Sequence, residues 1–257
     1  MNRRAQLQVI QNEWLFATRF DGDRLYAVTF QQTDPLWLLD LSDPDKPAIT
    51  GHLEVPSWSS FIEPMGNLLV AVGREGAGVQ ISLFDVTDRT APQLASRVNL
   101  GESGYSWSEA EWNEKAVRIL PKAGLILVPV TEWSGGKASH GVRILELNRS
   151  GKTLAALGSI RHEFSPRRST LLDGDLVASV SNRELLLVDV QDRSAPVVKA
   201  EATLAFGVDR LALYSSWLYQ FENGNSWSGG PSTAVMRVAP SNNPDGVVAQ
   251  IPLTASN

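Results

Sequence analysis

The sequence predicts an all-β protein, a β-propeller of about five four-stranded blades. Four apolar stretches each end in an acidic residue and a turn, and a fifth copy is degenerate. These copies are spaced by 45, 61, 43 and 48 residues, counted at Asp40, Asp85, Glu146, Asp189 and Arg237. No stretch keeps the 3.6-residue apolar period of a helix over a useful length. Repeats of this size made of short strands are typical of a propeller, with one sheet per repeat.

The first two blades follow from runs of apolar and β-branched residues that turn residues separate. The expected strands span residues 15–20, 24–30, 36–41 and 49–55, then 59–62, 68–73, 79–86 and 93–100. The first hairpin turns at Asp21-Gly22-Asp23, where glycine supplies the positive φ that a short turn needs.

The last three blades are expected to contain strands at 109–120, 125–130, 142–147 and 153–160, at 169–172, 176–180, 184–190 and 197–204, and at 208–214, 217–221, 234–238 and 247–252. Glycine turns recur at Lys122-Ala123-Gly124 and Asp173-Gly174-Asp175. We therefore expect one domain over residues 1–257, with approximate blade limits of 14–56, 57–101, 105–161, 165–205 and 206–254. The opening strand near Gln6–Ile10 suggests that the chain is the C-terminal part of a larger propeller or a shortened five-bladed relative.

The acidic residue that ends each third strand is interpreted as a turn former. Asp at the first position of a type I turn caps backbone N–H groups, and the following Pro presets φ. Paired acids such as Asp21/Asp23 and Asp173/Asp175 resemble calcium ligands, but none continues into an EF-hand loop. The pattern favours a structural turn over a metal site.

Composition limits the function classes. A net charge of −5 argues against nucleic acid as the main partner, since phosphate binding needs concentrated Lys and Arg. The absence of cysteine excludes disulfides and thiolate metal sites. No run approaches the roughly 18 apolar residues of a membrane-spanning helix. The first 16 residues do not form a signal peptide, because polar residues interrupt the apolar ones. No P-loop, dinucleotide or G-x-S-x-G motif is present, so no cofactor is expected.

Several stretches resemble, in order, a family of predicted secreted bacterial and archaeal proteins with a C-terminal β-propeller domain. They are RFDGDRLYAVTFQQTDPLWLLDLSD (19–43), LEVPSWSSFIEP (53–64), GVQISLFDVTDRTAP (78–92), SWSEAEWNEKAV (106–117) and SIRH (159–162). The resemblance covers roughly residues 15–190 and falls on the C-terminal half of the family's domain. It implies a propeller fold, an extracytoplasmic setting and no established activity. Glu63 and Glu114 stand where the resemblance leads us to expect histidine, which puts any role of those imidazoles in doubt.

Tryptophans in the loops give the main functional hypothesis. Trp58 and Trp107 lie between blades, and Trp133 and Trp227 lie between second and third strands. In a propeller these connections emerge on one face, so the four indoles could form a stacking surface for a glycan or a protein. The alternative is that each tryptophan folds inward and plugs its own blade.

Charged residues give two weaker candidates. Glu109 and Glu111 share one side of the expected third-blade strand, and paired carboxylates are what glycoside hydrolysis needs. Arg167 and Arg168 could bind a carboxylate or phosphate, or could neutralise a nearby acid. The three histidines have no metal-ligand spacing.

Three functions remain open from the sequence. The leading hypothesis is a non-enzymatic extracytoplasmic module whose tryptophan-rich face binds a glycan or protein. The alternatives are a carbohydrate-active hydrolase that uses channel carboxylates, and a purely structural section of a larger secreted protein.

Overall fold

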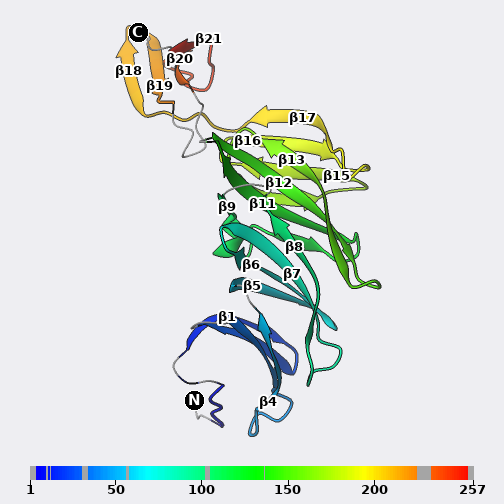
Figure 1. Cartoon of the computed structure of the whole chain (residues 1–257). Helices are drawn as coiled ribbons and strands as arrows, with labels where there is room; N and C mark the ends of the chain where they lie inside the picture. Colours follow the sequence, from blue (N-terminus) through cyan, green and yellow to red (C-terminus); the bar gives the residue numbers. More distant parts are fainter. Residues whose placement is uncertain are drawn as a thin grey trace.

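A computed structural model describes residues 4–9, 11, 13–30, 34–55, 58–101, 105–135, 137–224 and 233–253, without the side chains of residues 30, 34, 55, 58 and 59. Five antiparallel sheets follow one another along an arc (Figure 1), with the first and fifth sheets at its opposite ends. The predicted all-β propeller architecture is confirmed. None of the helices among these residues has the length and apolar character that a membrane crossing requires.

The first two sheets are four-stranded meanders in which each strand pairs with the next along the chain. The first contains β1 (Trp14–Asp21), β2 (Arg24–Phe30), β3 (Asp34–Asp40) and β4 (Ala48–Val55). The second contains β5 (Trp58–Met65), β6 (Leu68–Glu75), β7 (Gly78–Asp85) and β8 (Gln93–Leu100).

The third sheet differs from its predicted form. The expected strand over 109–120 is wrong: the segment contains the 3₁₀ helix η1 (Glu109–Glu111) and only a short strand, β10 (Arg118–Leu120). Ser108 starts η1 because its side chain accepts from the Ala110 N–H, while the Glu111 carboxylate accepts from the Ser108 N–H, a capping box. The rest comprises β11 (Leu125–Ser134), β12 (Lys137–Asn148), β13 (Thr153–His162) and the extra strand β9 (Tyr105–Trp107), which pairs with β11.

The fourth and fifth sheets return to four strands each. The fourth contains β14 (Pro166–Leu171), β15 (Leu176–Ser181), β16 (Glu184–Asp189) and β17 (Val197–Thr203). The fifth contains β18 (Arg210–Tyr214), β19 (Trp217–Glu222), β20 (Ala234–Pro240) and β21 (Ala249–Leu253).

Apolar side chains hold the first four sheets face to face. Tyr26 and Leu38 of the first sheet pack in one cluster with Leu69 and Phe84 of the second. A second cluster joins the second and third sheets, and a third joins the third and fourth. In the first four sheets, strands at the inner edge of the arc contact the neighbouring sheet: β1 contacts β5, β5 contacts η1, and both β10 and β11 contact β14.

The acidic turns after the third strands cap their own backbone and pack on the preceding sheet. Asp85 accepts from the Thr87 N–H, and Asp189 accepts from the Gln191 N–H, each at 3.0 Å. Lys152 also binds Asp85, so that hydrogen bonds from Lys152 and Thr87 lower the pKa of this carboxyl to about 2. These acids therefore stabilise turns. The repeated pattern of an apolar strand followed by an acidic turn is a structural element of each blade.

An Arg–Glu ion pair crosses every junction between successive sheets. From the first junction to the fourth, the pairs are Arg19–Glu63, Arg74–Glu111, Arg167–Glu109 and Arg183–Glu222. These pairs decide which charged groups remain available for a ligand.

Candidate functional site

Four aromatic side chains gather where β9 meets the end of β11, and we call Tyr105, Trp107, Trp112 and Trp133 the aromatic cluster. The β9–β11 register places Tyr105 opposite Trp133 and Trp107 opposite Thr131. The short helix η1 separates Trp107 from Trp112 by a single helical turn. Trp112, at its C-cap, therefore returns to stack on Trp107. Two short elements, neither of them predicted, thus assemble the cluster.

The three indoles of the cluster form a continuous stack. The ring centroids of Trp107 and Trp112 are 5.4 Å apart at an interplanar angle of 20°, and those of Trp107 and Trp133 are 6.5 Å apart at 27°. Tyr105 lies 6.2 Å from Trp133 in a tilted arrangement. Trp112 is 66% exposed and Tyr105 is 52% exposed. Large aromatic surfaces are usually buried, so this cluster has the character of a binding surface.

An ion pair between Arg74 and Glu111 packs against the aromatic cluster. The Arg74 guanidinium lies 4.9 Å from the centre of the Tyr105 ring and donates to both Glu111 carboxylate oxygens, at 2.9 and 3.1 Å. Arg74 also donates to the carbonyl oxygens of Ala77 and Ser106. The guanidinium N–H groups of Arg74 therefore donate to acceptors within the protein. Through the contact with Tyr105, Arg74 also helps to position the aromatic cluster.

The cluster opens into a pocket of about 1080 Å³ that Phe16 of β1 also lines. Phe16 belongs to the innermost strand of the first sheet, so the pocket extends across the inner edge of the arc. The lining of the pocket consequently comes from the first and third sheets, which supply the aromatic rings, and from the second sheet, which supplies Arg74.

The structure describes the side chains of two of the four predicted tryptophans, and it brings these two together. Trp107 and Trp133, predicted to share a face, stack on each other. Trp227 lies outside the described residues, and for Trp58 only the backbone is described, paired with Arg74. Sequence reasoning missed Tyr105, Trp112 and Phe16. The Ser108–Glu111 capping-box spacing was the available signal for Trp112, because it predicts a helical turn just before it.

The two predicted carboxylates do not form an open pair. Glu111 belongs to the Arg74 ion pair, whereas Glu109 accepts from Arg167 at 2.5 Å and from Arg168 at 3.1 Å. Burial raises the pKa of the Glu109 carboxyl, but the hydrogen bonds from both arginines outweigh burial and keep that pKa below its usual value. Arg167 and Arg168 thus both form ion pairs with the Glu109 carboxylate.

Glu63 and Glu114, the two departures from the family pattern, lie together in the structure. Both bind the Arg19 guanidinium, with Glu114 3.1 Å away. Two acids far apart in sequence therefore share one arginine at the inner edge of the arc.

A buried polar network joins the third and fourth sheets at His162. The imidazole Nδ1 lies 2.8 Å from Glu184 and Nε2 lies 2.7 Å from the Ser179 hydroxyl. An ionised carboxylate only accepts, so Nδ1–H donates to Glu184 and the neutral ring accepts from Ser179. The Ser179 hydroxyl is fully buried, so this Ser–His–Glu arrangement holds the sheets together and presents no accessible nucleophile.

Acid is expected to destabilise the protein through this network. Burial lowers the pKa values of both His140 and His162. In the native state these two imidazoles therefore stay neutral, whereas in the unfolded chain they take up protons near pH 6.5. Stability should fall as the pH drops from 7.5 to 5.5, measured as the urea midpoint at each pH. His162→Asn should flatten this dependence, whereas His52→Asn, at an exposed histidine, should leave it unchanged. Equal slopes in wild type and His162→Asn would contradict the assignment.

A model of the beta propeller domain family matches residues 1–191. The chain belongs to this family. An uncharacterized protein of Archaeoglobus fulgidus is 41% identical over 119 residues, which are 46% of this chain and 19% of that protein. An uncharacterized protein of Methanocaldococcus jannaschii is 35% identical over 114 residues, which are 41% of this chain and 18% of that protein. The matched part is thus about a fifth of the length of these curated relatives.

Solved structures with a similar arrangement share little sequence with this propeller. A provisionally named 6-phosphogluconolactonase of Bacteroides uniformis has 12% identity and a TM-score of 0.48, covering 91% of this chain and 69% of that chain. The computationally designed protein Ika4 has 11% identity and a TM-score of 0.45, covering 71% of this chain and 93% of that chain. These values carry no inference about function.

Proposed function

We propose that this propeller domain is a non-catalytic protein-binding module whose aromatic cluster receives an apolar segment of a partner protein. The observation that carries the proposal is the indole stack of Trp107, Trp112 and Trp133 at a large pocket, with Trp112 exposed and the other two half-buried. Tryptophan, tyrosine and arginine are the residues most often found at the energetic centre of protein interfaces.

The polar groups at the cluster favour a protein over a glycan. Sugar hydroxyls need free hydrogen-bonding side chains, but Arg74 and Glu111 already satisfy each other and are 15% and 5% exposed. An apolar peptide segment needs mainly ring surface and a few donors. Within the described residues, nothing accepts from the indole N–H of Trp107 or Trp112, which leaves two donors for a partner's backbone.

The hydrolase alternative has weaker support. Its two carboxylates should flank a scissile bond at roughly 5–10 Å from each other. Glu109 and Glu111 instead serve two different sheet junctions, each bound by arginine. We therefore infer a positioning role for both. The family resemblance supports an extracytoplasmic setting as part of the proposal, and fractionation of the native cells tests it.

Selection from a random peptide display library tests the proposal. We expect enrichment of peptides rich in aromatic and aliphatic residues, and Trp112→Ala should weaken their binding by about 2 kcal/mol, roughly thirtyfold in Kd. Trp112 is exposed, so this change should leave the melting temperature unaltered. Trp217→Ala in β19 is the matched control and should bind normally. Enrichment of no peptide, or binding of a glycan panel with the same Trp112 dependence, would overturn the protein-partner proposal.

A further inference from the structure

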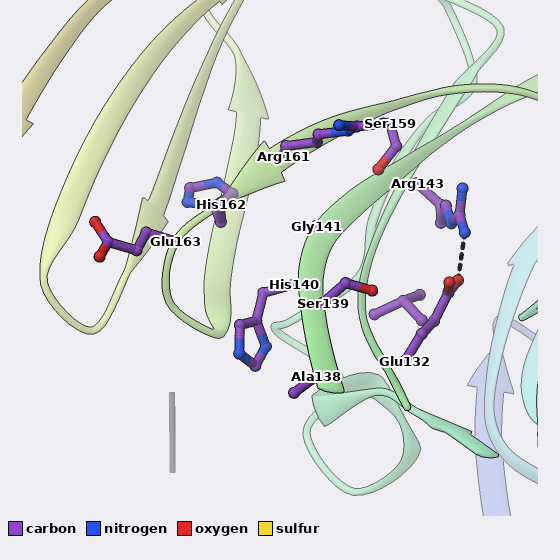
Figure 2. A pocket seen from close by; sticks show the side chains of 11 residues that line it. Glu132, Ala138, Ser139, His140, Gly141, Arg143, Ser159, Arg161, His162 and Glu163 are labelled. Carbon is purple, nitrogen blue, oxygen red and sulfur yellow. Dashed lines mark hydrogen bonds and ion pairs between the residues drawn. The ribbon is translucent and has the colours of Figure 1, made fainter. Parts of the chain in front are cut away.

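A second pocket, of about 610 Å³, lies at one end of β11, β12 and β13 in the third sheet. Figure 2 shows that its side chains divide between two sides of these strands. Arg143, Ser159 and Arg161 lie together on one side, with Glu132 below Arg143, while His140 and His162 lie on the other. The arginine side is chemically separate from the buried histidine network.

The strand register explains why the two arginines meet. Arg143 pairs with Ser159 and Gly141 pairs with Arg161 across β12 and β13, so Arg143 and Arg161 are diagonal neighbours on one face. Diagonal positions lie within reach of long side chains, and two like charges there repel each other. The register thus places two arginines on one face of the sheet as diagonal neighbours, where their like charges are unfavourable.

Only one of these two charges is neutralised. Glu132 binds Arg143 in an ion pair. In the part of the chain that the structure describes, the Arg161 guanidinium makes no ion pair or hydrogen bond, and Figure 2 shows Glu163 directed away from it. One positive charge is therefore left over at the pocket, beside the Ser159 hydroxyl.

Gly141 keeps the floor of this site open. A Cβ atom at this position would lie 2.7 Å from the Ser159 hydroxyl and 2.9 Å from the Ile160 carbonyl oxygen. Any side chain here would displace Ser159. The bare backbone therefore lets a hydroxyl donor sit between the two arginines.

We propose that Arg161, Ser159 and Arg143 bind an oxyanion, the carboxylate or phosphate group of a small molecule. Guanidinium groups bind both anions through paired N–H donors, and a hydroxyl adds a third donor. An anion here would also relieve the repulsion between the two arginines. The site is independent of the aromatic cluster, since Glu132 and Trp133 are successive residues of β11 and point to opposite sides.

Thermal unfolding and calorimetric titration test the proposal, with inorganic phosphate and acetate as probes and sodium chloride of equal ionic strength as the reference. We expect at least one probe to raise the melting temperature saturably above the chloride reference. Arg161→Gln should weaken that binding at least tenfold, and Gly141→Ala should also weaken it. Arg210→Gln makes the same charge change in β18 and should bind as wild type. The response to phosphate against acetate identifies the preferred anion.

Two results would overturn the site. The first is a melting temperature that rises no further with either probe than with chloride. The second is unchanged binding in Arg161→Gln, which would mean that the anion binds elsewhere. Because Arg161 is exposed, its replacement should not unfold the protein, and each result can be read without ambiguity.

Discussion

Gly158→Ala should lower the free energy of unfolding by about 3 kcal/mol, the upper end for overpacking a well-packed contact. A Cβ at Gly158 in β13 would lie 2.3 Å from the Arg193 carbonyl oxygen and 3.1 Å from Pro196. These atoms belong to the acidic turn of the fourth sheet, whose backbone cannot move aside cheaply. The backbone entropy that alanine would save is below about 1 kcal/mol, so the clash decides the sign. A melting temperature lower by roughly 6–12 °C would be the measured effect.

Ala200→Val is the matched control. Ala200 pairs with Leu187 just before the bulge of β16 and β17, as Gly158 pairs with Ile144 just before the bulge of β12 and β13. Ala200 is exposed. Valine there should change stability by no more than about 0.5 kcal/mol. If Gly158→Ala unfolded at the wild-type midpoint, the turn would not be firmly seated on the preceding sheet.

The same turn contact shows what sequence reasoning could reach and what it could not. The recurring acid, turn and proline predict a blade turn because the chemistry is local. Gly51 in β4 meets the Arg89 carbonyl oxygen as Gly158 meets that of Arg193. The partners are tens of residues apart, and a glycine inside a strand does not say which turn will rest on it.

The aromatic cluster divides in a similar way. Trp107 and Trp133 could be placed together because propeller connections alternate between two faces. The apolar pattern predicts a strand over 109–120 that includes Trp112, but the Ser108–Glu111 capping box forms η1 there instead. The same strand pattern places Glu109 and Glu111 on one side of a strand and so predicts a carboxylate pair. In the structure Glu109 contacts arginines of the fourth sheet and Glu111 an arginine of the second, since a helical turn directs them to different neighbours.

Glu222→Gln should cost about 3–5 kcal/mol in the attachment of the fifth sheet, the range for removing one partner of a buried ion pair. Glu222 in β19 is 2% exposed and binds Arg183 of the fourth sheet and, at 2.8 Å, Arg237 of β20. Burial and the charge of Arg237 already lower the pKa of Arg183. Removing the carboxylate would leave the buried Arg237 and the half-buried Arg183 without the counter-charge that they share. Hydrogen exchange of β18 to β21 should accelerate, with cleavage by protease near residues 205–209.

The control is Glu114→Gln, because Glu114 is 55% exposed in its pair with Arg19 and such surface pairs contribute at most about 1 kcal/mol. Replacing both Glu222 and Arg237 by apolar residues should restore part of the loss, since the uncompensated charge is the main cost. Packing at this junction differs from the others, where apolar clusters join the sheets. Unchanged hydrogen exchange of the fifth sheet in Glu222→Gln would contradict this prediction and would mean that apolar contacts attach the sheet. Replacing both Glu222 and Arg237 would then be neutral or destabilising.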